Sequence, residues 1–200
     1  MGRVSDARER LMHAVSELIF TGSYGTTTIE QICDKAGVKK GSFYHFFESK
    51  AELAEAAVEA AWQEHKQKLD HIFSPATPPL ERLARCCDFE FEEQAKLKEQ
   101  YGRVLGCALC ALGAEVSTQE DRLRRKVDEV MRQVRMYFET TLRDAHAAGL
   151  ITGDPVAKAR AVYAFHEGSL TQARIENDLE ILRGLKEGTM ELLGVQYAAK

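Results

Sequence analysis

Apolar residues recur at helical spacing along almost the whole chain. In the first 21 residues they fall mostly three or four positions apart, which places them on one stripe of a helix. That stripe consists of Ala7, Leu11, Ala14, Leu18 and Ile19. The alternation typical of strands is almost absent, and the chain contains no Asn-Gly or Asp-Gly hairpin turn. The pattern therefore predicts an all-α fold.

Nine helices follow from the apolar stripes and from the residues that begin and end helices. Thr27 or Thr28 begins the second helix, because each has a Glu or Gln three residues later, and Gly37 suits its left-handed end. The predicted helices cover residues 5–21, 27–36, 39–47, 49–72, 79–98, 105–115, 118–148, 154–177 and 178–193. We expect two domains, residues 1–50 and 51–200.

Charge is unevenly distributed along the chain. The formal net charge is −4, yet residues 1–50 hold seven Lys or Arg against six Asp or Glu. The remainder holds 20 basic and 25 acidic residues. The N-terminal segment is therefore the part better suited to an anionic partner such as nucleic acid.

The composition is that of a soluble globular protein, with 44% hydrophobic and 29% charged residues. No run is long enough to span a bilayer, and the N-terminus lacks the apolar core of a secretory signal. Five cysteines, an odd number, fit a reducing compartment better than a disulfide framework. We expect a cytoplasmic protein with no membrane partner. The motifs of phosphate loops, nucleophile elbows and zinc proteases are absent, so we expect no enzyme, no catalytic residue and no cofactor.

Residues 39–47 divide into two faces when placed on a helix. Phe43, Phe46 and Phe47 share one side and would anchor so short a helix to its neighbours. The opposite side carries a glycine, a hydroxyl, a phenol and an imidazole, which are Gly41, Ser42, Tyr44 and His45. Such groups can approach a groove closely and bond to phosphates or base edges. Two short helices joined by a glycine turn indicate a helix-turn-helix, whose second helix enters the major groove. A packed corner of a helical domain is the alternative.

Residues 5–53 resemble the DNA-binding domain of the tetracycline-repressor (TetR) family. The matching positions are the first helix with Gly22 and Gly25, then Thr27-Thr28-Ile29-x-x-Ile32, then Ala36-Gly37-Val38, and Lys40-Gly41-Ser42-Phe43-Tyr44-His45-Phe46-Phe47-x-Ser49-Lys50-x-Glu52-Leu53. Cys33 departs from the pattern, at a place where the family often has alanine. The resemblance implies a three-helix helix-turn-helix domain followed by a helical ligand-sensing and dimerisation domain. It also implies a repressor that binds a palindromic operator as a homodimer and is released by a small-molecule inducer.

The resemblance also selects the residues that would contact double-stranded DNA. They are Thr27, Thr28, Lys39, Lys40, Gly41, Ser42, Tyr44, His45 and Lys50. On the family pattern, those from Lys40 to Tyr44 face the groove, while Tyr44, His45 and Lys50 bind phosphates with help from helix N-termini. The face contains no Arg, Asn or Gln, so we expect phosphate positioning and DNA shape to contribute heavily to selectivity.

The resemblance places the dimer surface on the last two helices and the ligand cavity in the middle ones. The dimer candidates are a small-residue stripe and a set of leucines: Ala157, Ala161, Ala164, Gly168, Leu179, Leu182, Leu185 and Leu193. The cavity candidates are Trp62, Phe89, Cys107, Met136, Tyr137, Tyr163 and His166, of which His166 is the best polar one. A ligand there would move the fourth helix and change the distance between two recognition helices. Ordinary core packing is the alternative for each residue.

The cysteines raise two further hypotheses. Cys86-Cys87 and Cys107-x-x-Cys110 could hold zinc, but adjacent cysteines point to different faces of a helix, so we expect no metal site. The stretch around Gly106-Cys107 is similar to a Gly-Cys stretch of some TetR-like repressors, including ones that sense electrophiles. Because a cysteine near a helix start gains thiolate character, Cys107 could be a redox or electrophile sensor, or simply a small hydrophobe. A helical adaptor that binds another protein is the alternative to a DNA-binding regulator.

Overall fold

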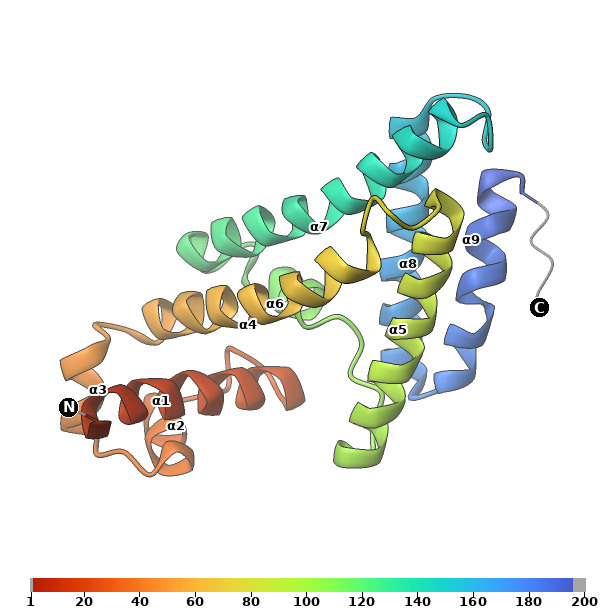
Figure 1. Cartoon of the computed structure of the whole chain (residues 1–200). Helices are drawn as coiled ribbons and strands as arrows, with labels where there is room; N and C mark the ends of the chain where they lie inside the picture. Colours follow the sequence, from red (N-terminus) through yellow and green to blue (C-terminus); the bar gives the residue numbers. More distant parts are fainter. Residues whose placement is uncertain (1, 196–200) are drawn as a thin grey trace. The chain divides into compact units, whose positions relative to one another are not determined.

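In the computed structural model, the described part of the chain is residues 2–195, which form α-helices and one 3-10 helix without any strand (Figure 1). The elements are α1 Gly2–Thr21, α2 Ile29–Ala36, α3 Lys40–Phe46, α4 Lys50–Ile72, α5 Pro79–Tyr101, α6 Ala108–Val116, α7 Asp121–Ala147, α8 Pro155–Glu176, η1 Leu179–Gly184 and α9 Leu185–Leu193. The all-α prediction is confirmed, with nine α-helices in this part of the chain. None of these helices combines the length and apolarity that crossing a bilayer requires.

One predicted helix differs in type from the observed structure. The predicted ninth helix over 178–193 begins instead as the 3-10 helix η1, and α9 starts only at Leu185. The Asp178 carboxylate accepts a hydrogen bond from the Glu180 amide at 2.9 Å and caps this tighter turn. Gly184, which disfavours a helix interior, separates the two segments.

The chain divides into two compact units. The first contains the residues up to His65 and Ala108–Val130, and the second contains Lys66–Cys107 and the residues from Met131 onward. The chain therefore passes between the units inside α4, directly before α6 and inside α7.

The core of the first unit is built by α1, α2, α3 and the start of α4. α1 packs against α2, α3 and α6. Its apolar stripe is buried in one cluster with the inner faces of its neighbours, and this cluster contains Leu11, Ala14, Val15, Ile32, Cys33, Ala36, Phe43, Phe47, Leu53 and Ala57. The inner face of α2 is buried in this cluster, and this burial holds so short a helix in place.

The core of the second unit lies among α5, α8, η1 and α9, which pack on one another. One apolar cluster joins Val104, Leu170, Ala173 and Leu182. A buried guanidinium organises the loop before α5: Arg82 donates to the carbonyl of Thr77 at 2.7 Å and to Asp144 at 2.6 Å. These bonds supply partners for a charge that burial would otherwise destabilise.

Candidate nucleic-acid interface

The polar side of α3 faces solvent. Ser42 and His45 are exposed, and the Tyr44 side chain is 53% exposed. A Cβ atom added at Gly41 would meet nothing within 4 Å, so the backbone there is open to a partner surface. Lys39, which precedes α3, and Lys40, its first residue, are also exposed. The polar face of α3 is therefore accessible to a partner, as a recognition helix requires.

The aromatic side of α3 is sealed in the core. Phe43 is fully buried and Phe47 is 3% exposed, with their ring centroids 6.1 Å apart. The Phe43 ring meets the Tyr44 ring edge-on at 5.2 Å, so the buried ring also supports the exposed one. The guanidinium of Arg8 covers Phe47 at 5.3 Å. Because these rings fix the rotation of α3, its polar groups are presented in a defined orientation.

Local hydrogen bonds fix the two ends of α2. The hydroxyl of Thr28 accepts from the Gln31 amide at 3.2 Å, and the Gln31 side chain accepts from the Thr28 amide at 2.8 Å, which is the predicted capping box. At the other end Gly37 has φ +61°, the left-handed conformation that glycine adopts without strain. Arg10 of α1 donates to the Ala36 carbonyl at 2.9 Å. The helix that precedes α3 is therefore held at both ends.

Two of the residues predicted to contact DNA point into the protein. Thr27 is 5% exposed, and its hydroxyl donates to the Ser23 carbonyl at 2.6 Å. Lys50 is half-buried, with Nζ donating to the carbonyls of Tyr24 at 2.7 Å and Thr27 at 2.8 Å. Burial lowers the pKa of this lysine, although nearby carboxylates oppose the shift. Both side chains therefore stabilise the turn before α2, whereas the exposed Thr28 remains available to a phosphate.

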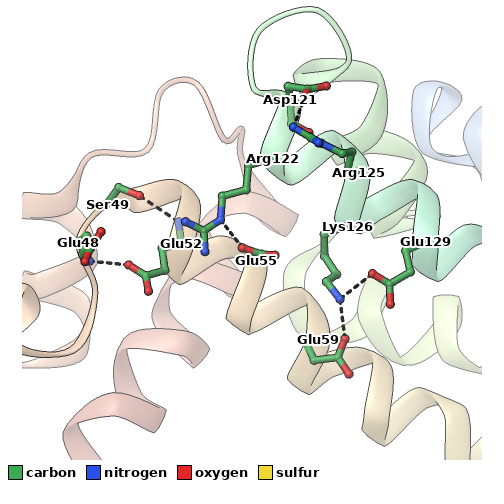
Figure 2. A network of polar contacts seen from close by, with 10 residues as sticks. All are labelled: Glu48, Ser49, Glu52, Glu55, Glu59, Asp121, Arg122, Arg125, Lys126 and Glu129. Carbon is green, nitrogen blue, oxygen red and sulfur yellow. Dashed lines mark hydrogen bonds and ion pairs between the residues drawn. The ribbon is translucent and has the colours of Figure 1, made fainter.

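Ion pairs fasten the start of α4 to the start of α7 within the first unit (Figure 2). Ser49 caps α4 by accepting from the Glu52 amide at 3.1 Å, and the Glu52 carboxylate accepts from the Glu48 amide at 2.7 Å. Farther along α4, two carboxylates bind cations of α7: Arg122 pairs with Glu55, and Lys126 pairs with Glu59 at 3.0 Å. These contacts hold the segment that directly follows the helix-turn-helix.

Comparisons with known proteins agree with this geometry. Residues 11–57 match the bacterial regulatory proteins of the tetR family, and residues 79–187 match the tetracyclin repressor-like C-terminal domain. The chain belongs to the TetR family. It is a helix-turn-helix transcriptional regulator, not an enzyme.

Relatives of this TetR-family regulator span most of its length. The transcriptional regulator AcuR of Cereibacter sphaeroides is 30% identical over 85% of this chain and 77% of its own. The transcriptional repressor NemR of Escherichia coli K12 is 26% identical over 88% of each chain. A solved structure of a regulatory protein TetR from Rhodobacter sphaeroides has a TM-score of 0.80 at 26% identity, covering 93% of this chain and 98% of that one.

Three of the predicted ligand residues meet around aromatic rings in the second unit. The rings of Tyr163 and His166 both contact Phe138 edge-on, each at 5.4 Å between centroids. Phe138 also contacts Phe73 at 5.5 Å, which in turn contacts Tyr137 at 5.3 Å. The sequence analysis missed Phe73 and Phe138, since an isolated Phe in a helix gives no signal beyond core packing. Together these five rings form an aromatic cluster.

The other four ligand candidates lie elsewhere. Met136 is 63% exposed, so the prediction that it lines a cavity of the second unit is wrong. Phe138, two residues later, lies on the buried side of α7 instead. Phe89 is half-buried beneath the ammonium of Lys68, which lies 5.5 Å from its ring. Trp62 is buried in the first unit, and Cys107 is half-buried in the second.

Two acidic residues of the second unit, Glu167 and Glu90, were not predicted from the sequence. His166 is 4% exposed, and neither ring nitrogen has a hydrogen-bond partner. Burial lowers its pKa, and Glu167, whose carboxylate lies 3.9 Å from Nδ1, only partly opposes this. Glu90 of α5 has a pKa raised to about 8, first by burial and then by the charge of Glu167. Burial thus favours the neutral form of both the His166 imidazole and the Glu90 carboxyl group.

The predicted dimer residues separate into two groups. The small-residue stripe of α8, Ala157, Ala161, Ala164 and Gly168, is exposed along its whole length, and Ile175 farther along α8 is 78% exposed. In contrast, Leu182, Leu185 and Leu193 are buried in the second unit, and Leu179 is half-buried. The leucines of η1 and α9 therefore serve mainly as core, and the stripe of α8 is the available surface.

Proposed function

We propose that this regulator is a repressor that binds a palindromic operator as a homodimer and leaves it when a small-molecule inducer binds. The main support is the exposure of Ser42, Tyr44 and His45 on a helix whose opposite side is anchored by the buried Phe43. A duplex can reach these groups without any rearrangement of the domain. Because its partner would be chromosomal DNA, we also place the protein in the cytoplasm.

In this proposal α3 is the recognition helix. Gly41 allows close approach to the groove, Ser42 and Tyr44 contact bases or phosphates, and His45 binds a phosphate. Lys39 and Lys40, both exposed, add cations that release counterions on binding. A single helix with so few groups makes few contacts, so tight binding requires a second copy on the symmetric half-site.

The α8 stripe is the proposed dimer surface. Its exposed small residues allow a second α8 to approach closely, and the exposed Ile175 adds apolar area. The inducer is proposed to bind the second unit beside the aromatic cluster, where the unpartnered imidazole of His166 offers hydrogen-bonding capacity. Inducer binding would shift the population of two arrangements that differ in operator affinity.

Selection of bound duplexes from a random DNA pool tests the proposal. The expected product is an inverted repeat, whose affinity falls steeply with salt because phosphate contacts release counterions. Sedimentation at micromolar protein concentration should show a dimer. Enrichment of no sequence, together with affinity that is independent of salt, would reject the DNA-binding proposal, and a monomer would reject the dimer.

A second candidate signal is an electrophile that reacts with Cys107. Cys33, Cys86 and Cys87 are buried, and burial raises the pKa of Cys87 to about 12, whereas Cys107 is only half-buried. The Sγ atom of Cys107 lies within 4.8 Å of the Cys110 Sγ atom and of a Glu167 carboxylate oxygen. Treatment with N-ethylmaleimide should release DNA from the wild-type protein and from Cys110→Ser, but not from Cys107→Ser. Release from Cys107→Ser as well would assign the effect to another residue.

A further inference from the structure

Arg8, in the second turn of α1, lies against the end of the recognition helix. α1 and α3 pack on each other within the first unit, with the N-terminal end of α1 beside α3 (Figure 1). The Arg8 guanidinium covers Phe47, the residue that ends α3, at 5.3 Å from the ring centroid, and it donates to the Met12 thioether at 3.5 Å. Met12 in turn packs against the core cluster that contains Phe47. The head group of Arg8, an exposed residue, is therefore held against a ring and a sulfur atom at the surface.

Arg10, two residues later, shows how differently a second arginine of α1 is used. It pairs with Asp6 at 3.5 Å and donates to the Ala36 carbonyl at 2.9 Å. Its charge and its donors thus serve the protein itself, because they hold the end of α2 on α1. The ring and the thioether that hold Arg8 carry no charge. Its exposed guanidinium is therefore positioned without being neutralised by these contacts, and it keeps donors that face solvent.

The position of Arg8 continues one row of side chains on α3. Lys40, Tyr44 and Phe47 are spaced by four and then three residues, so they follow one another along the helix. Phe47 still occupies a helical position, because its amide donates to the Phe43 carbonyl at 2.9 Å. Since Arg8 covers Phe47, its cation lies one turn beyond the exposed phenol of Tyr44. The exposed Lys40 lies at the other end of α3.

We propose that Arg8 binds a phosphate of the operator backbone and so extends the nucleic-acid interface from α3 onto α1. This inference rests on the proposed function and adds a contact outside α2 and α3. A guanidinium forms paired, charge-assisted hydrogen bonds to phosphate oxygens, and one that is already packed on a ring loses less freedom when it does so. Cations at both ends of α3 also suit a helix that lies in a groove, because a phosphate strand borders the groove on each side.

The same contacts are compatible with a purely structural role, in which Arg8 only shields the Phe47 ring from water. The two roles differ in their response to salt. A phosphate contact releases condensed counterions, so each contact adds about 0.9 to the slope of log affinity against log salt concentration. A residue that only supports the fold changes the affinity without changing this slope.

Salt-dependent binding of the full-length protein to a duplex selected from a random pool tests the proposal. Arg8→Gln should weaken binding about tenfold at about 0.1 M salt and reduce the slope by about 1.8 for a dimer, with one phosphate per protomer. Arg8→Met, which keeps an apolar cover on Phe47 in case the first variant folds poorly, should lose the same slope. Arg8→Lys, which keeps the charge but lacks the planar fork, should retain the slope and lose about threefold in affinity. An unchanged slope in Arg8→Gln and Arg8→Met would overturn the proposal, even if their affinity fell.

Arg183→Gln is the matched control. Arg183, in the second unit, is also exposed, and its guanidinium lies 4.9 Å from the centre of the Phe91 ring. The variant therefore removes the same charge and the same kind of ring contact from a helix that the proposal does not place on DNA. Its affinity and slope should equal those of the wild type. A loss of slope equal to that of Arg8→Gln would show a general effect of charge and would overturn the assignment to Arg8.

Ethylation interference locates the contact on the DNA. Ethylation removes the charge of one phosphate at a time, and it should weaken wild-type binding at a phosphate of each half-site where it no longer affects Arg8→Gln. Identical interference patterns for the two proteins would overturn the proposal. A wild-type protein that binds no duplex would refute the proposed function together with the Arg8 contact. An unchanged slope in the Arg8 variants, with wild-type binding intact, would refute the Arg8 contact alone.

Discussion

Two regions of the molecule use the same three side-chain types in opposite ways. On α3 these side chains are Phe43, Tyr44 and His45. In the second unit they are Phe138, Tyr163 and His166, whose rings meet around Phe138. On α3 only the phenylalanine is buried, and the phenol and imidazole face solvent. In the second unit all three are buried. A large rigid partner can use the first arrangement as it stands, whereas only a small molecule that enters the protein can reach the second.

The two regions also differ in the charged groups that surround them. The exposed face of α3 contains no carboxylate, and cations precede it at Lys39 and Lys40. In the second unit the imidazole of His166 lacks a hydrogen-bond partner, and the Glu167 carboxylate lies 3.9 Å from its Nδ1 atom. Buried polar groups without partners destabilise a fold, and they concentrate at functional sites. Under the proposed function, the first region suits a polyanion and the second suits a ligand that completes its hydrogen bonds.

The largest effect should come from removing the anchor of the exposed region. Phe43→Ala deletes a fully buried ring and should lower the free energy of unfolding by about 3–5 kcal/mol, with loss of operator binding because α3 loses its orientation. Denaturant unfolding measures the free energy of unfolding, and a gel shift measures operator binding. Phe138→Ala, which removes a ring of similar burial from the second unit, should cost comparable stability but retain DNA binding at low temperature. Equal loss of operator binding in both variants would contradict the assignment of DNA binding to α3.

The exposed region could be predicted from the sequence because its determinants are local. The spacing of Phe43 and Phe47, the capping box at Thr28 and the glycine at position 37 lie within one short stretch, and the structure places each as expected. Even there, local reasoning failed to foresee which groups point inward. Lys50 was expected to bind phosphate, yet it binds the carbonyl of Tyr24, a residue 26 positions earlier.

Long-range contacts explain most of what the sequence did not reveal. Glu115 lies about 90 residues after the turn between α1 and α2 that it binds, and no spacing rule connects the two. Glu90 resembles the other acidic residues of α5, and only tertiary packing distinguishes it by raising its pKa. Met136 and Phe138 are equally apolar in sequence, but the rotation of α7 exposes the first and buries the second.

A smaller effect should follow from changing the exposed phenol alone. Tyr44→Ala should weaken operator binding by at least about tenfold while the melting temperature stays nearly constant, since the side chain is 53% exposed. Tyr44→Phe, which keeps the ring but lacks the hydroxyl, separates stacking from hydrogen bonding. Tyr101→Ala at the end of α5 is a control for loss of a phenol elsewhere. Unchanged affinity of Tyr44→Ala would remove this residue from the interface.

The smallest effect should come from changing Glu90, an acidic residue of the second unit. The pKa of Glu90 is raised to about 8 in the folded protein, so folding favours its protonated form. Its contribution to stability is present below the unfolded pKa of about 4.3 and is lost as pH rises through about 8. Glu90→Gln, which stays neutral, should therefore melt about 2–4 °C higher than the wild type at pH 8.5 and converge with it below about pH 4. Glu92→Gln on the same helix is the control. A difference in melting temperature between Glu90→Gln and the wild type that does not change with pH would show that the Glu90 carboxyl group is not destabilised by burial.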